Sequence, residues 1–291
     1  MSRLLIIDGH AYAYRAFHAI RELRSPVGQP TNAIYGFVKM LEKMRAAVGP
    51  THLIVVWDGG LCEERLAALP DYKAQRPEMP ADLRPQLDGI VQYLAAAGIA
   101  SYRADGVEAD DYIATLAGLA AASWNVVIAS SDKDFMQLVS TRIGLLNPND
   151  KTGMIWGREQ VLAKAGVEPE QVADWLALMG DAVDNIPGVP GVGPKTAAEL
   201  LKQFGSVEKL LVRLDEVKSN KLRQALRTAA VAVVRNQKLV RLPAVPCQFM
   251  PEQLVVGAGD RAALGRLLAG WGFKGMLAEL EAPGVKQVEL I

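Results

Sequence analysis

The chain has 291 residues, of which 50% are hydrophobic and 22% are charged. These values are typical of a globular protein with one large or two small domains, and they exclude a disordered chain. The two cysteines, Cys62 and Cys247, are too few and too far apart for a disulfide scaffold or a zinc finger. The first apolar run, 4–7, is too short for a signal peptide, and no run approaches the roughly 20 apolar residues of a membrane helix. We therefore expect a cytoplasmic protein with no membrane partner.

The net charge is zero, with 32 basic and 32 acidic residues, and this balance argues against a nucleic-acid partner. The charges are segregated, however, with a balance of −7 over residues 106–184 and +7 over residues 195–241. Such segregation fits a protein that gathers divalent cations beside a polyanion, but it also fits two solvated surfaces of compensating charge. The charge distribution alone favours the second explanation.

The first half of the chain alternates predicted strands and predicted helices. Strands are expected at 3–8, 52–58 and 125–130, and helices at 32–48, 83–97 and 110–122. Continuous apolar strands separated by helices indicate a parallel sheet that is covered on both faces. The connection at 59–85 is long and is expected to be a functional loop, partly helical, or else disordered.

The second half reads as mainly helical. From residue 158 onward, helical patterns are broken by a cluster of Gly and Pro at 186–194, which marks tight turns. We therefore expect an α/β part at 1–155 and a mainly helical part at 156–291.

Acidic side chains follow each predicted strand. Asp8 and Asp58 end the first two strands, and Asp132 and Asp134 follow the third. Because the carboxyl ends of parallel strands share one edge, where open α/β folds bind ligands, we expect these four carboxylates at one rim. An Asp at the end of a strand is also a common turn residue, so each of them alone is weak evidence.

Five further acids occur in two tight groups. Glu108, Asp110 and Asp111 begin a predicted helix, where they could equally act as caps, and Asp181 and Asp184 precede the Gly/Pro cluster. Clustered carboxylates repel one another unless a cation neutralises them, and oxygen ligands without Cys or His select Mg²⁺ or Mn²⁺ over Zn²⁺. Nine carboxylates exceed the needs of one ion, and paired ions are typical of phosphoryl displacement. Without these nine acids the chain has a charge of +9, which suits a nucleic-acid partner.

Short motifs in a fixed order extend over residues 8–197. They read DGHAYAYRAF at 8–17, PTNAIYGF at 30–37, DYKAQR at 71–76, EADD at 108–111, SDKD at 131–134, GDAVDNIPG at 180–188 and GVGPKTA at 191–197. Together they resemble the motifs of the bacterial 5′-3′ exonuclease and flap endonuclease family, which includes the N-terminal nuclease domain of DNA polymerase I. The resemblance implies a PIN-like parallel-sheet nuclease domain at 1–155, with an arch loop at about 59–85. It also implies a mainly helical domain at 156–291 with a helix-hairpin-helix-type (H3TH) DNA-binding turn at 186–197.

The activity implied by the resemblance is that of a 5′-3′ exonuclease and structure-specific 5′-flap endonuclease. Such an enzyme hydrolyses DNA phosphodiester bonds with two Mg²⁺ or Mn²⁺ ions, in replication primer processing or in repair. We expect a stand-alone, monomeric, nucleoid-associated chain that acts on DNA with 5′ ends or flaps, with a separate DNA polymerase as a candidate partner. Two alternatives stay open. A non-catalytic flap- or junction-binding protein is disfavoured by the complete acidic set, and a metal-dependent ribonuclease is disfavoured by the Gly/Pro turn.

The resemblance assigns roles to individual residues of the nuclease part. The implied metal-site acids are Asp8, Asp58, Glu108, Asp110, Asp111, Asp132, Asp134, Asp181 and Asp184. Lys73 would be the electrostatic partner of the scissile phosphate, Arg76 a steering contact, and Arg15 a second phosphate contact. Tyr72 would stack on a base, and Arg65 would contact DNA from the arch. The alternative for the arch residues is a solvated loop, and the alternative for Arg15 is a surface ion pair.

At the turn of the helical part, the implied DNA-binding residues are Gly188, Gly191, Gly193, Lys195 and Thr196. Small residues there let a phosphate approach the backbone N–H groups of a helix N-terminus. Carbonyls near Val189 and Val192 are a candidate site for K⁺, as in some relatives. The sequence departs from the family pattern at Trp57, where relatives usually carry Phe, and we expect local repacking there. It departs again at 61–65, where an extra acid precedes Arg65.

Overall fold

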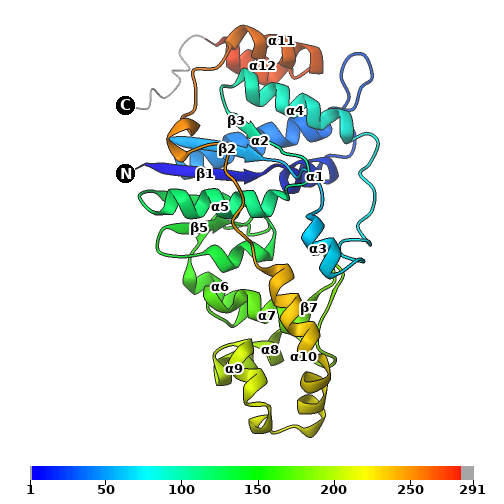
Figure 1. Cartoon of the computed structure of the whole chain (residues 1–291). Helices are drawn as coiled ribbons and strands as arrows, with labels where there is room; N and C mark the ends of the chain where they lie inside the picture. The colour runs from blue at the N-terminus through cyan, green and yellow to red at the C-terminus, as the bar shows by residue number, and fades with distance from the viewer. Residues whose placement is uncertain (1, 283–291) are drawn as a thin grey trace.

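The computed structural model describes residues 2–282, and its centre is a six-stranded sheet (Figure 1). The strands are β1 (Arg3–Asp8), β2 (His52–Val56), β3 (Ala100–Tyr102), β4 (Asn125–Ala129), β5 (Ile143–Leu146) and β6 (Ile155–Trp156). Their order is β3-β2-β1-β4-β5-β6, with β1 to β5 parallel and β6 antiparallel to β5. The predicted parallel sheet is therefore confirmed. Because the strand order reverses at β1, the carboxyl ends of β1 and β4 form a switch point of the kind that binds ligands.

Helices cover both faces of the sheet because alternate strand residues point to opposite sides. In β1, Leu4 and Ile6 belong to one buried cluster, and Leu5 and Ile7 belong to the other. The second cluster lies under α1 (Gly9–Ala19), α2 (Asn32–Val48) and α4 (Arg84–Ala96), whereas the first packs against α5 (Ala109–Ala121). Figure 1 shows α2 and α4 on one side of the strands and α5 on the other.

The arch segment, residues 59–85, leaves the end of β2 and returns to the start of α4. It holds one short helix, α3 (Glu63–Ala68), and otherwise irregular turns. Lys73 has a φ of 56°, a conformation that non-glycine residues adopt only at special positions. The segment is packed against the rest of the protein, since Tyr72, Lys73 and Leu83 are all buried.

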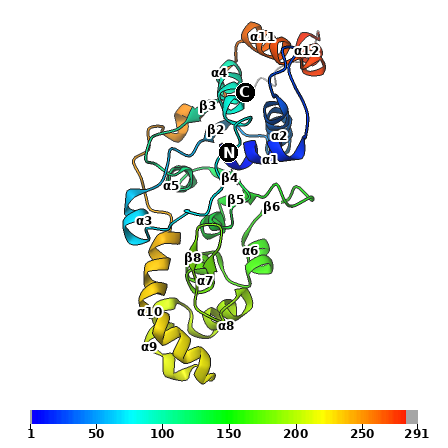
Figure 2. The ribbon, with the colours of Figure 1, turned by 90° about the vertical axis from the view of Figure 1, so that its right-hand side faces the viewer.

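The second part of the chain is helical (Figure 2). Its helices are α6 (Arg158–Ala165), α7 (Val172–Met179), α8 (Pro194–Phe204), α9 (Val207–Val212) and α10 (Asn220–Val240). A two-stranded ribbon of β7 (Gly180–Asp181) and β8 (Ile186–Pro187) precedes α8. Short 3₁₀ helices also occur among the described residues: η1 (Lys133–Leu138), η2 (Pro169–Gln171), η3 (Leu214–Glu216) and η4 (Pro251–Leu254).

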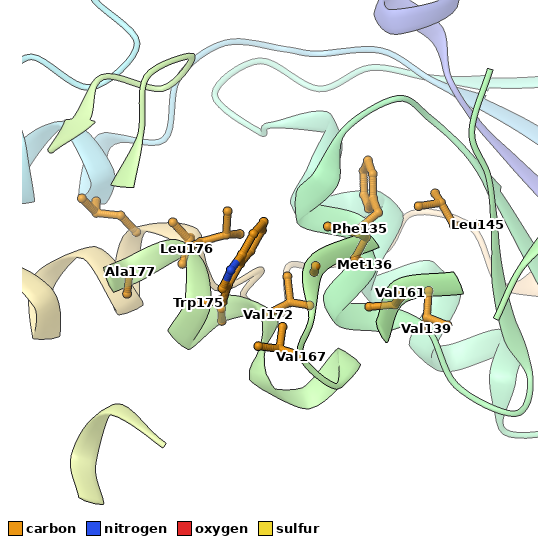
Figure 3. Packing of buried hydrophobic residues seen from close by; sticks show 14 of the residues in the cluster. Phe135, Met136, Val139, Leu145, Val161, Val167, Val172, Trp175, Leu176 and Ala177 are labelled. Carbon is orange, nitrogen blue, oxygen red and sulfur yellow. The ribbon is translucent and has the colours of Figure 1, made fainter. Parts of the chain in front are cut away.

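One hydrophobic core joins the two parts. Phe135 of η1, Leu145 of β5 and Val161 of α6 lie in the same buried cluster as Trp175 and Leu176 of α7 (Figure 3). The tight packing of such a core fixes the position of the elements that surround it. The loop after β4 and the ribbon after α7 are therefore held in a defined relationship.

The segment after α10 returns to the α/β part. Val255 pairs with His52 of β2, and Gly257 N–H donates to Gly98 O. Two more helices, α11 (Arg261–Trp271) and α12 (Lys274–Glu281), follow, and their side chains join the core cluster of α2 and α4. The division expected from the sequence puts α11 and α12 in the helical part at 156–291, whereas in the structure these two helices pack on the α/β part. Among residues 2–282, no helix is both long and apolar enough to cross a membrane.

Candidate active site

The carboxyl ends of β1 and β4 hold the first acids of the site. Asp8 ends β1 and caps α1, its Oδ1 accepting a hydrogen bond of 3.0 Å from Ala11 N–H. Its other oxygen, Oδ2, accepts one of 2.8 Å from the hydroxyl of Ser130, which directly follows β4. Burial raises the pKa of Asp8 to about 6. The strand geometry expected from the sequence therefore places Asp8 where a ligand would bind.

A cavity of about 390 Å³ opens at this switch point. Five of the nine acids line it: Asp8, Asp58, Asp110, Asp132 and Asp181. Burial, and next the charge of Asp132, raise the pKa of Asp110 well above its usual range. Keeping several buried carboxylates ionised costs free energy, and a bound cation would remove this cost.

A second group of acids lies beside the cavity. Asp134, Asp181 and Asp184 each offer a carboxylate oxygen within 4.8 Å of the other two. Asp134 Oδ1 is buried and has no hydrogen-bond partner among residues 2–282. Burial and the neighbouring acids raise the pKa of Asp134. An unpaired buried oxygen among carboxylates fits a hard divalent cation, whose preferred ligands are oxygens.

The remaining two acids are held by buried cations of the arch. Lys73 Nζ lies 2.5 Å from Glu108 Oε2, and Arg65 forms two hydrogen bonds of 2.7 Å to the two oxygens of Asp111. Burial opposes the ionisation of Glu108, but the charges of Lys73 and Arg65 outweigh it and keep its pKa below the usual range. The structure thus brings all nine acids to one region but turns only seven of them toward the cavity or the triad.

The structure places Tyr72 and Arg65, which the resemblance assigns to DNA contacts, inside the protein. Tyr72 is only 3% exposed, and its hydroxyl lies 3.2 Å from Glu108 Oε2 and 3.3 Å from Asp184 Oδ2. Arg65 is 6% exposed and fully engaged with the protein. Because the segment folds inward onto the acids, stacking of Tyr72 on a base stays a prediction that requires the segment to move.

The other expected arch contacts are placed differently. Lys73 is 4% exposed, so its ammonium faces Glu108 rather than the cavity. Arg76 lines the cavity and donates a hydrogen bond of 2.7 Å to Asp184 Oδ1. Arg15 is exposed on α1 and donates to Asn149 Oδ1. Of these three cations, Arg76 is therefore the one that lines the cavity.

Two residues of the site were not selected from the sequence. Ser130 holds Asp8 and also accepts a hydrogen bond of 3.1 Å from Asp132 N–H. Lys133 lies 2.8 Å from Asp181 Oδ1 and lines the cavity. Ser130 lies two residues before Asp132, and Lys133 lies between Asp132 and Asp134, so closeness to the predicted acids in the chain could have indicated both residues.

The departure at Trp57 is absorbed by packing. Trp57 stacks on Phe37 and donates a hydrogen bond of 2.8 Å to Ser101 Oγ. Its ring lies against Gly9, where a Cβ would meet Trp57 Cε3 at 2.5 Å. The large indole is accommodated because the first residue of α1 has no side chain.

The Gly/Pro cluster forms a tight turn before α8. Gly188 passes close to the backbone of Met179 and Gly180. A Cβ on Gly188 would lie 2.2 Å from Met179 O and 2.6 Å from Gly180 N. Gly191 has a φ of +81°, and Gly193 caps α8 with open space around it. Lys195 is exposed and Thr196 half-buried in the first turn of α8. Val189 and Val192 are buried, and Val192 N–H donates to Val189 O.

Two protein-family models match the chain, and together they extend over most of it. The 5′-3′ exonuclease N-terminal resolvase-like domain matches residues 3–166, and the 5′-3′ exonuclease C-terminal SAM fold matches residues 167–262. The chain belongs to the 5′-3′ exonuclease family. The 5′-3′ exonuclease of Aquifex aeolicus is 39% identical over 97% of this chain and 96% of its own length.

The chain is also similar to part of a longer protein and to proteins of known structure. DNA polymerase I of Bacillus caldotenax is 37% identical over 98% of this chain, which spans 33% of that relative's length. T5 5′-exonuclease with bound divalent metal ions (zinc) has a TM-score of 0.69 and 27% identity, covering 83% of this chain and 90% of its own. The catalytic core of Rad2 in complex with DNA substrate shares the fold, with a TM-score of 0.66, 20% identity, and coverage of 96% and 91%. The predicted fold class, a parallel-sheet nuclease domain followed by a helical domain, is confirmed.

Proposed function

We propose that this chain hydrolyses phosphodiester bonds of DNA at 5′ ends and 5′ flaps, with two divalent cations as cofactors. The observation that carries the proposal is the convergence of seven carboxylates from both parts of the chain, five at the cavity at the switch point of the sheet and two in the acidic group beside it. Membership of the 5′-3′ exonuclease family supports this reaction.

The acids divide into two candidate sets for the ions. Asp8, Asp58, Asp110 and Asp132 line the cavity and would hold one ion, whereas Asp134, Asp181 and Asp184 would hold the other. Oxygen ligands favour Mg²⁺ or Mn²⁺. The chemistry that such paired ions supply, when bound, is activation of a water and stabilisation of charge on the leaving oxygen.

The protein's own residues then bind and orient the substrate. Arg76, at the cavity wall, is suited to contact a phosphate of the cleaved strand, because its guanidinium offers donors in a planar fork. Arg15 on α1 is a second, exposed candidate. Lys73 would reach a phosphate only by leaving Glu108. Its proposed role at the scissile phosphate therefore requires the arch to move when DNA binds.

The turn before α8 is the proposed DNA-holding element. Gly191 and Gly193 keep the backbone accessible, Gly188 allows the tight turn behind them, and Lys195 adds a charge at the N-terminus of α8, which begins at Pro194 just before Thr196. Contacts of this kind position DNA without reading its sequence. K⁺ at the carbonyls near Val189 and Val192 is part of the same proposal.

The cellular setting is proposed from the relatives. A likeness to DNA polymerase I over 98% of the chain supports a role in primer processing or repair, with a polymerase as partner. We propose a monomer that is associated with the nucleoid.

The test of the proposed reaction is a titration of Mg²⁺ and Mn²⁺ against a 5′-flap DNA with product lengths resolved. Asp110→Asn should abolish cleavage while DNA binding persists, because Asp110 lines the cavity. Asp105→Asn, an exposed acid in the preceding loop, is the control that should cleave normally. A matched RNA flap that is cleaved as fast would indicate a ribonuclease. Binding without any cleavage by the natural chain would indicate a non-catalytic flap-binding protein.

A further inference from the structure

Arg65 on α3 is a buried guanidinium that contacts two other elements, α5 and the C-terminal end of α10. Nη1 and Nη2 each donate a hydrogen bond of 2.7 Å to Asp111 of α5, and Nη1 also lies 3.2 Å from Glu108 Oε1. Nε donates to Leu239 O at 3.1 Å, and Nη2 donates to Arg241 O at 3.2 Å. A guanidinium has five N–H groups in one plane, and these contacts engage all three of its nitrogens.

The first contact surface is the beginning of α5. Glu108 occupies the N-cap position of this helix and Asp111 lies in its first turn, so the two residues lie on either side of Asp110 in the chain. Asp110 is the residue of this group that lines the cavity. A partner that fixes the residues on both sides of Asp110 therefore also fixes the direction in which its carboxylate points.

The second contact surface is the C-terminal end of α10. The last carbonyls of a helix have no partners within the helix and carry the negative end of its dipole, so a buried cation satisfies both needs. Arg65 supplies this cation at Leu239 and Arg241. In both views α3 lies beside this end of α10 (Figures 1 and 2). The helix α10 in turn packs on α7 and α9 of the helical part.

We propose that Arg65 is a positioning residue that sets the metal-site acid Asp110 and locks the helical part in register with the cavity. This inference rests on the proposed function, because the register matters only if DNA held by the helical part is cut at the cavity. Arg65 itself is too buried to touch the substrate. Its effect is transmitted through α5 on one side and α10 on the other.

The test compares Arg65→Lys and Arg65→Met with the natural chain. A lysine keeps the charge but cannot bridge an aspartate bidentately and reach α10 as well. Loss of a residue that orients ligands typically costs about 10–100-fold in metal affinity or activity. We therefore expect the Mn²⁺ midpoint, measured by calorimetry on the DNA-free protein, to rise by about 10–100-fold in Arg65→Met and by less in Arg65→Lys.

The readout that reports the register is the position of the cut on one fixed 5′-flap DNA. The natural chain should give one main product, and the Arg65 variants should spread cleavage over neighbouring phosphates with a lower kcat. The dissociation constant of the same DNA without metal should stay within about twofold, since Arg65 lies beneath the surface. All assays are run well below the unfolding temperature of each variant.

Arg158→Met is the matched control, because Arg158 also forms two ion pairs of 2.8 Å but does so on the exposed face of α6. It should leave the Mn²⁺ midpoint and the cut position unchanged. If Arg65→Met does not fold, Asp111→Asn tests the same link from its other end. Its effect on the Mn²⁺ midpoint should match that of Arg65→Lys and should not add to it.

Two outcomes would overturn the inference. A folded Arg65→Met with the natural Mn²⁺ midpoint, kcat and cut position would reduce Arg65 to a stabilising residue. A loss of metal-free DNA affinity with an unchanged Mn²⁺ midpoint would return it to the DNA surface. Failure of the proposed function has a different signature, because the natural chain would then cleave no flap with either ion.

Discussion

Ser130 and Asp8 lie side by side at the carboxyl ends of β4 and β1, where the Ser130 hydroxyl donates a hydrogen bond of 2.8 Å to Asp8 Oδ2. The same hydroxyl accepts a hydrogen bond of 3.1 Å from Asp132 N–H. One buried oxygen therefore ties together the acids that follow the two central strands. The arrangement depends on both strands, which are separated by more than a hundred residues of chain.

Ser130→Ala should remove this link without changing the charge of the site. We expect the free energy of unfolding to fall by about 1–3 kcal/mol, because Asp132 N–H and Asp8 Oδ2 lose a buried partner. Flap cleavage should slow by about tenfold or more, as is typical when a partner that orients a ligand is lost. Urea denaturation and a single-turnover assay measure the two effects. Ser123→Ala, at an exposed position after α5, should change neither.

The acids also predict how stability depends on pH and on metal. The pKa of Asp8 is raised to about 6, and the pKa values of Asp110 and Asp134 are raised by burial first. A carboxyl whose pKa is higher in the folded state favours folding at low pH and loses that contribution as the pH rises through the folded-state pKa. The contribution of these groups should therefore make the unfolding temperature of the metal-free protein lower at about pH 7.5 than at about pH 5.

Addition of Mn²⁺ or Mg²⁺ should reverse this loss. Metal binding requires deprotonated ligands and stabilises the folded state, so the rise in unfolding temperature should be larger at the higher pH. Differential scanning fluorimetry with and without EDTA measures the effect. An equal shift at both pH values, or no shift, would contradict the assignment of these acids to a metal site.

The buried pair of Lys73 and Glu108 should show strong coupling in a double-mutant cycle. Lys73→Met and Glu108→Gln should each lower the free energy of unfolding, by about 3–5 kcal/mol where the partner charge is left buried. The double variant should lose clearly less than the sum, because neither charge then remains unpaired. Urea unfolding of the four proteins gives the coupling. Additive losses would mean that the two residues do not depend on each other.

Two glycines of the turn before α8 should respond differently to alanine. Gly188→Ala places a Cβ 2.2 Å from Met179 O and should destabilise the protein by about 1–3 kcal/mol or more. Gly193→Ala meets nothing within 4 Å and should cost less than about 1 kcal/mol as a helix cap. If a phosphate approaches this backbone, Gly193→Ala should weaken DNA binding although the fold is intact. Unchanged affinity would place the DNA elsewhere.

Lys195→Ala should weaken binding to all DNA sequences alike. Lys195 is exposed in the first turn of α8, and loss of one phosphate contact should reduce the slope of log K against log salt by about 1. Filter binding over a range of salt concentrations measures this slope. Lys164→Ala, an exposed lysine on α6, is the control. A loss that varied with sequence would show that the turn contacts bases.

The sequence by itself determined the features that depend on local order in the chain. The apolar runs that end in Asp8 and Asp58 became β1 and β2, because parallel strands are buried on both faces and their carboxyl ends meet at one edge. The strands β3 and β5 escaped prediction because Ala100–Tyr102 is only three residues long and Gly144 interrupts Ile143–Leu146. Their membership of the sheet comes from pairing with neighbours that lie far away in the chain.

Only the tertiary structure decided which charged groups face one another. The motif around Tyr72 and Lys73 reads as an exposed, DNA-facing loop, yet both side chains fold inward onto Glu108. Burial of opposite charges depends on the approach of distant segments, and the spacing of residues along the chain does not encode that approach. The same reason explains why Arg65 joins Asp111 to the end of α10, a link between three elements that are remote in sequence.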